Sequence, residues 1–431
     1  MNWVLISCFM IFGLKAQSQE ILTLDQAKEI TLANNFGIKI AQNNVTIAEN
    51  QTDKSVNGFL PTVTANGGIN SNFGSSTQQF NNGNEANVSN AFNWGLSGSV
   101  DANYTIYNKA RAISLEQLKE SLDATNLTLR QTIEQSLLNV YSSYYVVAQL
   151  SENIGLLEET LLVSEERKKR AQYALDLGQG SGLAVLNAQV DIQRDSVNLL
   201  NAILSLETEK RNLNVAMGRD TDIAFDVEKD SDLTNVDTLE SLVDKGKIEN
   251  ISIQLNRQNL IVNEYNLDLI NVENKPTLST GLSYSANFSD NASGAFITQS
   301  SSNGFAGNIG VNWTIFDGTR SIRRQNAVLN LSNQKLQIDQ LEQQIERDII
   351  NTWNNYQNDL FVIGVQEKAL ETNRENFIRT EEQFKRGQVN SIEFRQAQLN
   401  LLNAQFSLTN AKYSAKIREI QLKQLVGDIM N

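Results

Sequence analysis

Hydrophobic and polar residues alternate along four segments of the chain, the first and third of which follow its only prolines, Pro61 and Pro276. A period of two places apolar side chains on one face of a strand and polar side chains on the other. The pattern therefore predicts two β-hairpins, over residues 61–107 and 276–316, with tips rich in Asn, Ser and Gly. Each strand would have about 12–15 residues, more than the about 9–11 that a tilted strand needs to cross a bilayer.

Outside these hairpins, apolar residues recur at spacings of three and four, which is typical of amphipathic helices. The spacing predicts two very long helices, over residues 109–176 and 318–385, each about 100 Å long at about 1.5 Å per residue. Glycine-containing tips at 177–183 and 386–391 would then reverse the chain. The other predicted helices cover residues 23–60, 184–217, 238–274 and 392–426.

The same order of elements occurs twice, and individual residues repeat with it. Pro61 and Pro276 are 215 positions apart, whereas Gly178 and Gly387 are 209 positions apart. The difference in length lies within the hairpins. The chain is therefore a tandem duplication. The first repeat, the linker and the second repeat cover residues 19–218, 219–236 and 237–431.

The amino-terminal segment contains a short apolar run followed by Ala16-Gln17-Ser18, a small-x-small pattern of the kind that signal peptidases cleave. We expect residues 1–18 to be a signal peptide. A lipoprotein signal at Cys8 is the weaker alternative, because only seven residues precede this cysteine. Removal of the segment would leave an exported, acidic chain without cysteine.

The composition disfavours several classes of protein. The chain has no histidine, one cysteine and a net charge of −13. Without imidazole there is no Ser-His or Cys-His nucleophile pair and no histidine ligand for a metal. We therefore expect no enzymatic activity, no metal and no cofactor. The negative charge also argues against a nucleic-acid partner.

A sheet of four strands leaves two unpaired edges, which the lipid phase does not tolerate. Membrane barrels begin at about eight strands, so this chain would have to combine its strands with those of other copies. Two copies would give eight strands, and three would give twelve. A soluble β-sandwich with one solvent-exposed face would also explain the alternation of apolar and polar residues. A periplasmic coiled-coil adaptor or a surface adhesin would also contain long helices, and these two classes are the alternative to a membrane barrel.

The tips of the two helical hairpins carry related patterns, Gly178-x-x-Ser181-x-Leu183 and Gly387-x-x-x-Ser391-Ile392-Glu393. Together with the duplicated hairpins and long helices, these patterns resemble the TolC-like outer-membrane efflux proteins (the outer-membrane factor family). The resemblance implies a mixed α and membrane-β fold. Three tandem-duplicated chains would form a twelve-stranded outer-membrane β-barrel, and their long helices would continue it as a coiled-coil α-helical tunnel through the periplasm.

The same resemblance implies a function and a set of partners. The homotrimer would be a passive outer-membrane channel in a Gram-negative-type cell, with a large periplasmic part. It would belong to a tripartite efflux or type I secretion system. The expected partners are outer-membrane lipid, a periplasmic adaptor (membrane-fusion) protein and, through the adaptor, an inner-membrane transporter.

The resemblance assigns an aperture to the helical tips. Glu393 corresponds to an acidic position that faces this aperture in family members, where three copies would form a carboxylate ring that attracts cations. Gln396 corresponds to a position that is acidic in some members. A solvated glutamate on a helix face is the alternative role for Glu393.

Charged residues that hold the best-known member shut correspond here to Ala184 and Val389. We therefore expect an aperture closed by packing of Leu183, Ile392 and Phe384 and by neutral hydrogen bonds.

The resemblance also places the adaptor at the tips, where small residues would allow close approach, although turn geometry alone explains the glycines equally well. Gly155 and Gly364 are candidate hinges, because glycine inside a helix costs about 1 kcal/mol relative to alanine. Close helix packing, or simple inheritance from the duplication, is the alternative reason for them. The expected adaptor contacts are Gly178, Gln179, Gly180, Ser181, Gly182, Gly387, Gln388, Val389, Asn390 and Ser391.

Overall fold

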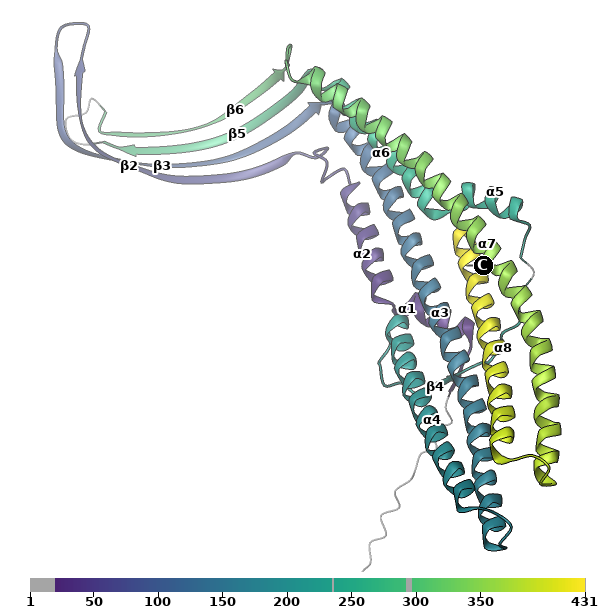
Figure 1. The fold of residues 1–431 in the computed structure, drawn as a ribbon. Coiled ribbons are helices and arrows are strands. Elements are labelled where there is room, and N and C mark those ends of the chain that lie inside the picture. The colour runs from purple at the N-terminus through teal and green to yellow at the C-terminus, as the bar shows by residue number, and fades with distance from the viewer. Residues whose placement is uncertain (1–19, 235, 292–296, 431) are drawn as a thin grey trace, which may run out of the picture. The chain divides into compact units, whose positions relative to one another are not determined.

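The computed structural model describes residues 20–234, 236–291 and 297–430 (Figure 1). The expected signal peptide and Cys8 lie outside these residues. The chain divides into two compact units. The helical unit comprises residues up to 41, 130–251 and from 342 onward, and the sheet unit comprises 42–129 and 252–341.

The sheet unit contains one antiparallel sheet of four strands in the order β2-β3-β5-β6. Two hairpins supply the strands, and β3 pairs with β5 to join them. The hairpins lie within the ranges predicted from the alternation of residues. The strands are β2 (Thr62–Gln79), β3 (Glu85–Tyr107), β5 (Thr277–Asp290) and β6 (Gln299–Asn312).

The register of these strands brings their apolar residues onto one face. Leu96 on β3 is directly opposite Ile69 on β2 and Phe288 on β5. On β6, Phe305 is opposite Tyr284, and their rings lie 4.8 Å apart. Phe305 is nevertheless 78% exposed. The sheet therefore presents a continuous apolar surface that the described residues do not cover.

The opposite face of the sheet is polar. Asp101 accepts hydrogen bonds from Asn66 at 3.0 Å and from Ser99 at 2.7 Å. A Cβ atom on Gly281 would lie only 2.6 Å from the amide oxygen of Asn308. The two faces thus differ as the alternation predicted, and within the described strands β2 and β6 each have one edge without a partner strand.

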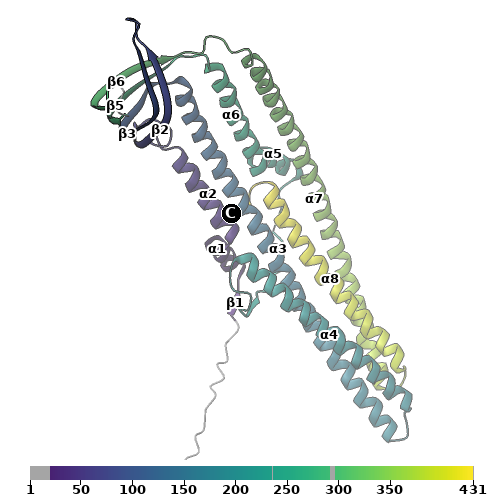
Figure 2. The ribbon, with the colours of Figure 1, turned by 90° about the vertical axis from the view of Figure 1, so that its left-hand side faces the viewer.

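Four long helices form two antiparallel hairpins. Figures 1 and 2 both show α4 beside α3 and α8 beside α7. The ends of α3 coincide with the predicted range 109–176. Among the described residues, no helix is both long and apolar enough to cross a membrane. The four helices are α3 (Lys109–Asp176), α4 (Gly182–Met217), α7 (Arg320–Lys385) and α8 (Ser391–Leu425).

The single helices predicted over 23–60 and 238–274 are each broken in two. The breaks are at Asn35 and Asn250, where ψ is 127° and 124°. The asparagine amides donate to the carbonyl oxygens of Ala216 at 2.8 Å and Leu425 at 2.9 Å. These bonds hold each break against the end of a later helix. At Asn35 the side-chain oxygen also accepts from the amide of Ile38 at 3.1 Å, a local cap that competes with helix continuation. The resulting helices are α1 (Leu24–Asn34), α2 (Phe36–Gln51), α5 (Leu239–Glu249) and α6 (Ile251–Val272).

A glycine packs against each of these breaks. Gly218 and Gly427 follow α4 and α8 with φ of +73° and +76°. A Cβ atom at either position would lie 2.5 Å from a backbone oxygen, that of Asn34 or of Glu249. Only glycine fits both this left-handed conformation and this close approach.

The predicted linker 219–236 lies within the helical unit and contains a short strand. This strand is β4 (Phe225–Val227), which pairs in parallel with β1 (Glu20–Leu22). Further along, the Thr234 hydroxyl donates to Glu419 on α8. Beneath these segments lies the main hydrophobic core, formed chiefly by Leu137, Val140, Tyr144, Val147, Leu213, Met217 and Phe225.

Candidate functional site at the helical tips

The two tip turns share one geometry. After α3, the amide of Gln179 donates to Ala174 at 2.8 Å and that of Gly178 donates to Leu175 at 2.9 Å. The amides of Gln388 and Gly387 make the equivalent bonds after α7. Gly178 and Gly387 have φ of +75° and +72°. These are Schellman motifs, in which a left-handed glycine satisfies the last carbonyl groups of a helix.

The returning helices begin with different caps. Ser181 accepts one hydrogen bond, from the amide of Ala184 at 3.3 Å. Asn390 accepts two, from the amides of Ile392 and Glu393 at 3.0 and 2.9 Å. The Glu393 carboxylate accepts in return from the amide of Asn390 at 3.3 Å. The second tip therefore has a complete capping box, and a carboxylate at the positive end of a helix is stabilising.

An aromatic cluster fixes the second hairpin just above its tip. Phe384 on α7 stacks on Phe394 of α8, with ring centroids 4.7 Å apart and 12° between the planes. Phe377 contacts the same ring at 5.5 Å. Phe394 is buried. Phe384, which we expected at the aperture, thus packs within its own hairpin.

A buried polar network joins the first hairpin to the second. The guanidinium of Arg395 on α8 donates to both carboxylate oxygens of Asp195 on α4, at 2.8 and 2.5 Å. The same guanidinium donates to Ser164 on α3 at 3.1 Å, and the Ser164 hydroxyl donates to Asp195 at 2.7 Å. Gln398 adds a bond to the carbonyl oxygen of Thr160 at 2.9 Å. Three helices meet in this network.

A second arginine extends the network towards the tip. Arg167 on α3 pairs with Asp191 on α4, and Asp191 also lies 3.8 Å from Nε of Arg395. Arg167 is 2% exposed, Asp195 3% and Arg395 7%. The two arginines balance the two aspartates. Removing one member of a buried pair leaves an uncompensated charge, which costs about 3–5 kcal/mol.

Sequence reasoning missed this network. We expected the charged links that hold the best-known family member shut to be missing, because Ala184 and Val389 occupy their positions, and we expected packing and neutral hydrogen bonds in their place. The structure has such a link at other positions. The available signal was Asp191 and Asp195, which lie four residues apart and so share a face of α4, in a segment with few other charges.

The remaining predicted aperture residues lie on the surface of the single chain. Leu183 is 66% exposed and Ile392 71% exposed. Glu393 and Gln396 are also exposed, and Gln396 donates to Asn400 at 2.8 Å. The structure therefore brings Phe384 against Phe394 but does not gather Leu183, Ile392 and Phe384 into one buried cluster within the chain.

The predicted adaptor contacts surround the two turns. Gln179, Ser181, Gln388 and Asn390 are exposed, and a Cβ atom on Gly182 would meet nothing within 4 Å. Gly180 differs, because its Cβ atom would lie 2.9 Å from backbone atoms of Ala174 and Leu175. Gly180 is thus required by the turn itself. Val389 and Ser391 are half-buried.

The candidate hinges Gly155 and Gly364 lie in the interiors of α3 and α7. Both are exposed, and a Cβ atom at either position would meet nothing within 4 Å. Close packing inside the chain therefore does not explain them. Among the described residues, there is also no cluster of acidic and cysteine side chains that could hold a metal ion.

Comparison with known proteins connects this geometry to a family. The sequence profile described as "Outer membrane efflux protein" matches residues 29–219 and 242–428, which together are most of the chain. The two matched segments correspond to the two repeats.

Individual relatives agree with the profile. Outer membrane protein TolC of Vibrio cholerae serotype O1 is 19% identical over 340 residues, which are 78% of this chain and 77% of TolC. The solved structure of the CmeC outer membrane channel of Campylobacter jejuni has a TM-score of 0.74 at 15% identity, over 94% of this chain and 86% of CmeC. VceC of Vibrio cholerae has a TM-score of 0.71 at 13% identity, over 94% and 96% of the two chains. At these identities, the likeness to solved structures shows a common fold.

Proposed function

From the premise that the chain belongs to the outer membrane efflux protein family, and is an outer-membrane efflux channel, we propose that it works as a homotrimer whose helical tips form a closable aperture. The predicted mixed fold, location and channel function agree with the family. The family consists of channel proteins, so no catalytic step is needed to explain the chain. The adaptor and adhesin alternatives do not fit this membership.

The sheet supports assembly of several copies of the chain. Its apolar face is exposed, and the outer edges of β2 and β6 lack partner strands within the described residues. Lipid offers no hydrogen-bond partners, so the backbone groups at these edges must pair with another protein strand. If β2 of one copy pairs with β6 of the next, a closed ring of copies satisfies every edge and turns all polar faces towards one lumen. The number three comes from the family, and it gives twelve strands.

A stripe on α4 supports the same assembly. Its apolar residues are spaced three or four positions apart, with one gap of seven, which is the spacing of a coiled-coil seam. All are more than half exposed in the single chain. A neighbouring copy would bury them. The stripe consists of Leu183, Leu186, Val190, Val197, Leu200 and Leu204.

The tips suggest how the channel closes. In our proposal the Arg395–Asp195 pair holds the second hairpin against the first when the channel is closed, and release of the second hairpin widens the aperture. Glu393, repeated three times, supplies the cation-attracting charge. The exposed turns at Gln179 and Gln388 contact the periplasmic adaptor, through which an inner-membrane transporter delivers cargo.

Membrane fractionation tests the trimer. The mature protein, extracted with detergent from outer membranes, should run as a trimer on a gel without heating and as a monomer after heating. A monomer released by salt alone would contradict the proposal.

Ion selectivity in a planar bilayer tests the aperture. Glu393→Gln should reduce the preference for cations, because it removes three carboxylates from the narrowest point. Glu382→Gln, which neutralises an exposed carboxylate near the same tip, is the control and should leave the preference unchanged. Equal selectivity of the Glu393→Gln variant and the wild type would remove Glu393 from the aperture.

A further inference from the structure

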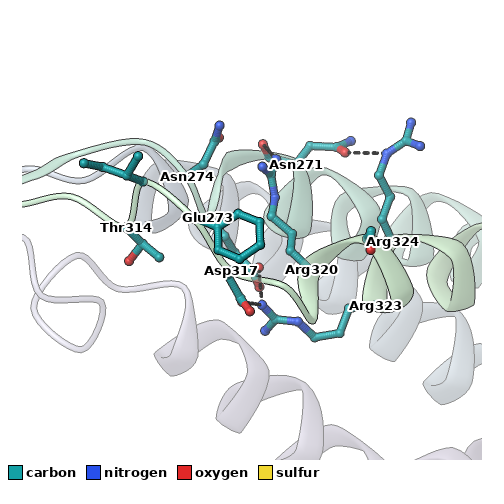
Figure 3. Close-up of a pocket in the computed structure, with 11 residues that line it drawn as sticks. Asn271, Glu273, Asn274, Thr314, Asp317, Arg320, Arg323 and Arg324 are labelled. Atoms are coloured by element: carbon teal, nitrogen blue, oxygen red, sulfur yellow. Dashed lines mark hydrogen bonds and ion pairs between the residues drawn. The ribbon is translucent and has the colours of Figure 1, made fainter.

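A cavity of about 610 Å³ lies in the sheet unit, where β6 leads into α7 (Figure 3). The end of α6 and the turn before β5 form its other wall. Three arginines line the cavity together with two carboxylates, so it carries a net positive charge in an acidic protein. The charged residues are Arg320, Arg323, Arg324, Glu273 and Asp317.

These arginines are engaged to different degrees. Arg320 donates to the carbonyl oxygens of Ile270 and Asn271, at 3.0 and 2.7 Å. Arg323 forms ion pairs with both carboxylates of the cavity. Arg324 donates to the side-chain oxygen of Asn271 at 3.1 Å and has no ion pair within the described part of the chain. Arg324 is also exposed, so most of its five N–H donors face solvent.

Comparison with the first repeat shows which of these arginines the strand-to-helix junction requires. Arg111 is the counterpart of Arg320, and it likewise donates to backbone oxygens, those of Gly58 at 2.6 Å and Thr105 at 2.9 Å. The counterparts of Arg323 and Arg324 are Ser114 and Leu115. Closing the junction between strand and helix therefore needs one arginine. Arg323 is accounted for by its ion pairs with Glu273 and Asp317, whereas Arg324 has no carboxylate partner within the described residues and requires a different explanation.

An apolar segment lies beside the cavity. Between β6 and α7, Trp313 is 58% exposed, Ile315 79% and Phe316 86%. The indole of Trp313 donates to the carbonyl oxygen of Asn274 at 2.9 Å, which fixes the ring at the junction. Exposed aromatic residues at the end of a membrane strand mark the level of the lipid headgroups. Guanidinium groups at this level can bind phosphate with two parallel hydrogen bonds.

We propose that Arg324, with the ion-paired Arg323 beside it, binds the phosphate of an anionic phospholipid in the leaflet on the helical side of the outer membrane. The acyl chains would lie along Ile315, Phe316 and the apolar face of β6. The site would occur once per chain, at the second repeat only. It rests on the membrane location given by the family, and it goes beyond export because it adds a lipid preference to the channel.

Native mass spectrometry of the full-length channel, extracted into equal amounts of phosphatidylglycerol and phosphatidylcholine, tests the proposal. The wild type should retain phosphatidylglycerol preferentially. One basic residue near a membrane surface contributes about 1 kcal/mol, so Arg324→Gln should lower this preference about fivefold. The double variant R323Q/R324Q should lower it further. Lys335→Gln, an exposed charge change further along α7, is the matched control and should have no effect.

Three results would overturn the proposal. One is an unchanged lipid preference in the double variant. A second is displacement of phosphatidylglycerol by millimolar inorganic phosphate, because this would show a general anion site. The third is protection of an Arg324→Cys variant from a maleimide in lipid-free trimers, because a neighbouring copy would then cover the site. The same spectra report the mass of the assembly, so failure to form trimers is distinguished from failure to bind lipid.

Discussion

The two repeats of this chain keep the same backbone devices but differ in the contacts that they make. Each breaks its first helical segment at an asparagine, Asn35 or Asn250, and each ends its last helix with a left-handed glycine, Gly218 or Gly427. The two repeats differ in the first helical turns of α4 and α8, directly after the tips. Leu186 is exposed on α4, whereas its counterpart Arg395 is buried on α8.

This difference distinguishes the features that the fold requires in both repeats from the buried ion pair, which only the helical hairpin of the second repeat supplies with an arginine. Helix breaks and Schellman glycines set the path of the chain, so both copies retain them. The Arg395–Asp195 pair exists once, because the counterpart of Asp195 is Ala404. The second helical hairpin is thus attached to the first by a specific buried pair that has no counterpart elsewhere in the duplication.

Giving the second repeat the residue of the first should have the largest effect. Arg395→Leu would leave Asp195 buried without its partner, and we expect a loss of about 3–5 kcal/mol in the free energy of unfolding. Chemical unfolding followed by circular dichroism measures it. The double variant R395L/D195A removes both charges and should recover most of the loss. A double variant as unstable as the single one would show that the pair is not the source of the effect.

Disrupting a feature that both repeats share should have similar consequences in each. Gly427→Ala and Gly218→Ala place a Cβ atom 2.5 Å from a backbone oxygen, at positive φ. We expect each to lose about 2–3 kcal/mol. Gly178→Ala has the same φ but open space around the Cβ atom, and it should lose about 1 kcal/mol. Thermal unfolding of the three variants checks this order, and equal losses would mean that the close approach has no importance.

Two buried glutamates should respond to pH in opposite directions. Burial raises the pKa of Glu134, and the nearby Arg130 only partly offsets this. The protonated form is then favoured in the folded state, so this contribution to stability is present below about pH 4.5 and is lost as the pH rises through the folded pKa. We therefore expect Glu134→Gln to increase stability at neutral pH.

For Glu419, burial also raises the pKa, but hydrogen bonds from Thr234 and the charges of Lys416 and Lys423 outweigh it and lower the pKa overall. Its contribution is present above about pH 4.5 and is lost as the pH falls through the folded pKa. Thr234→Val should cost about 1 kcal/mol at neutral pH and less in acid. Parallel unfolding curves at pH 7 and pH 4 would reveal both effects, and variants that respond equally at the two pH values would contradict them.

The smallest expected effect concerns the glycines inside the long helices. A Cβ atom on Gly155 or Gly364 meets nothing, so alanine should raise stability by about 0.5–1 kcal/mol per site. If these glycines are hinges, the double alanine variant should also export less while its closed-state conductance stays unchanged. A variant with undiminished export would leave them without a role in opening.

The sequence predicted those parts of the molecule that follow from periodicity. Alternation identified the two hairpins and their apolar face, and the spacing of three and four identified α3 to the residue. The helix breaks do not follow from periodicity, because each depends on the contacts of one asparagine side chain. The Asn35 oxygen accepts from the amide of Ile38, and the Asn35 and Asn250 amides donate to the distant carbonyl oxygens of Ala216 and Leu425.

The buried polar network between the helical hairpins was missed for a related reason. Arg395 and Asp195 are 200 positions apart, and each alone resembles a charged residue on a solvated helix face. Only the packing of α4 against α8 makes them a buried pair. The tip turns, by contrast, depend on local geometry, so Gly178 and Gly387 could be recognised from the sequence.

Single-channel conductance of purified trimers in a planar bilayer tests most directly whether the buried pair holds the channel closed. The variant R395Q/D195N keeps neutral hydrogen-bonding groups in place and removes the charges. We expect it to open more often or conduct more than the wild type, whereas Arg386→Gln, which removes an exposed ion pair at the same tip, should not. Wild-type conductance in R395Q/D195N would contradict the account.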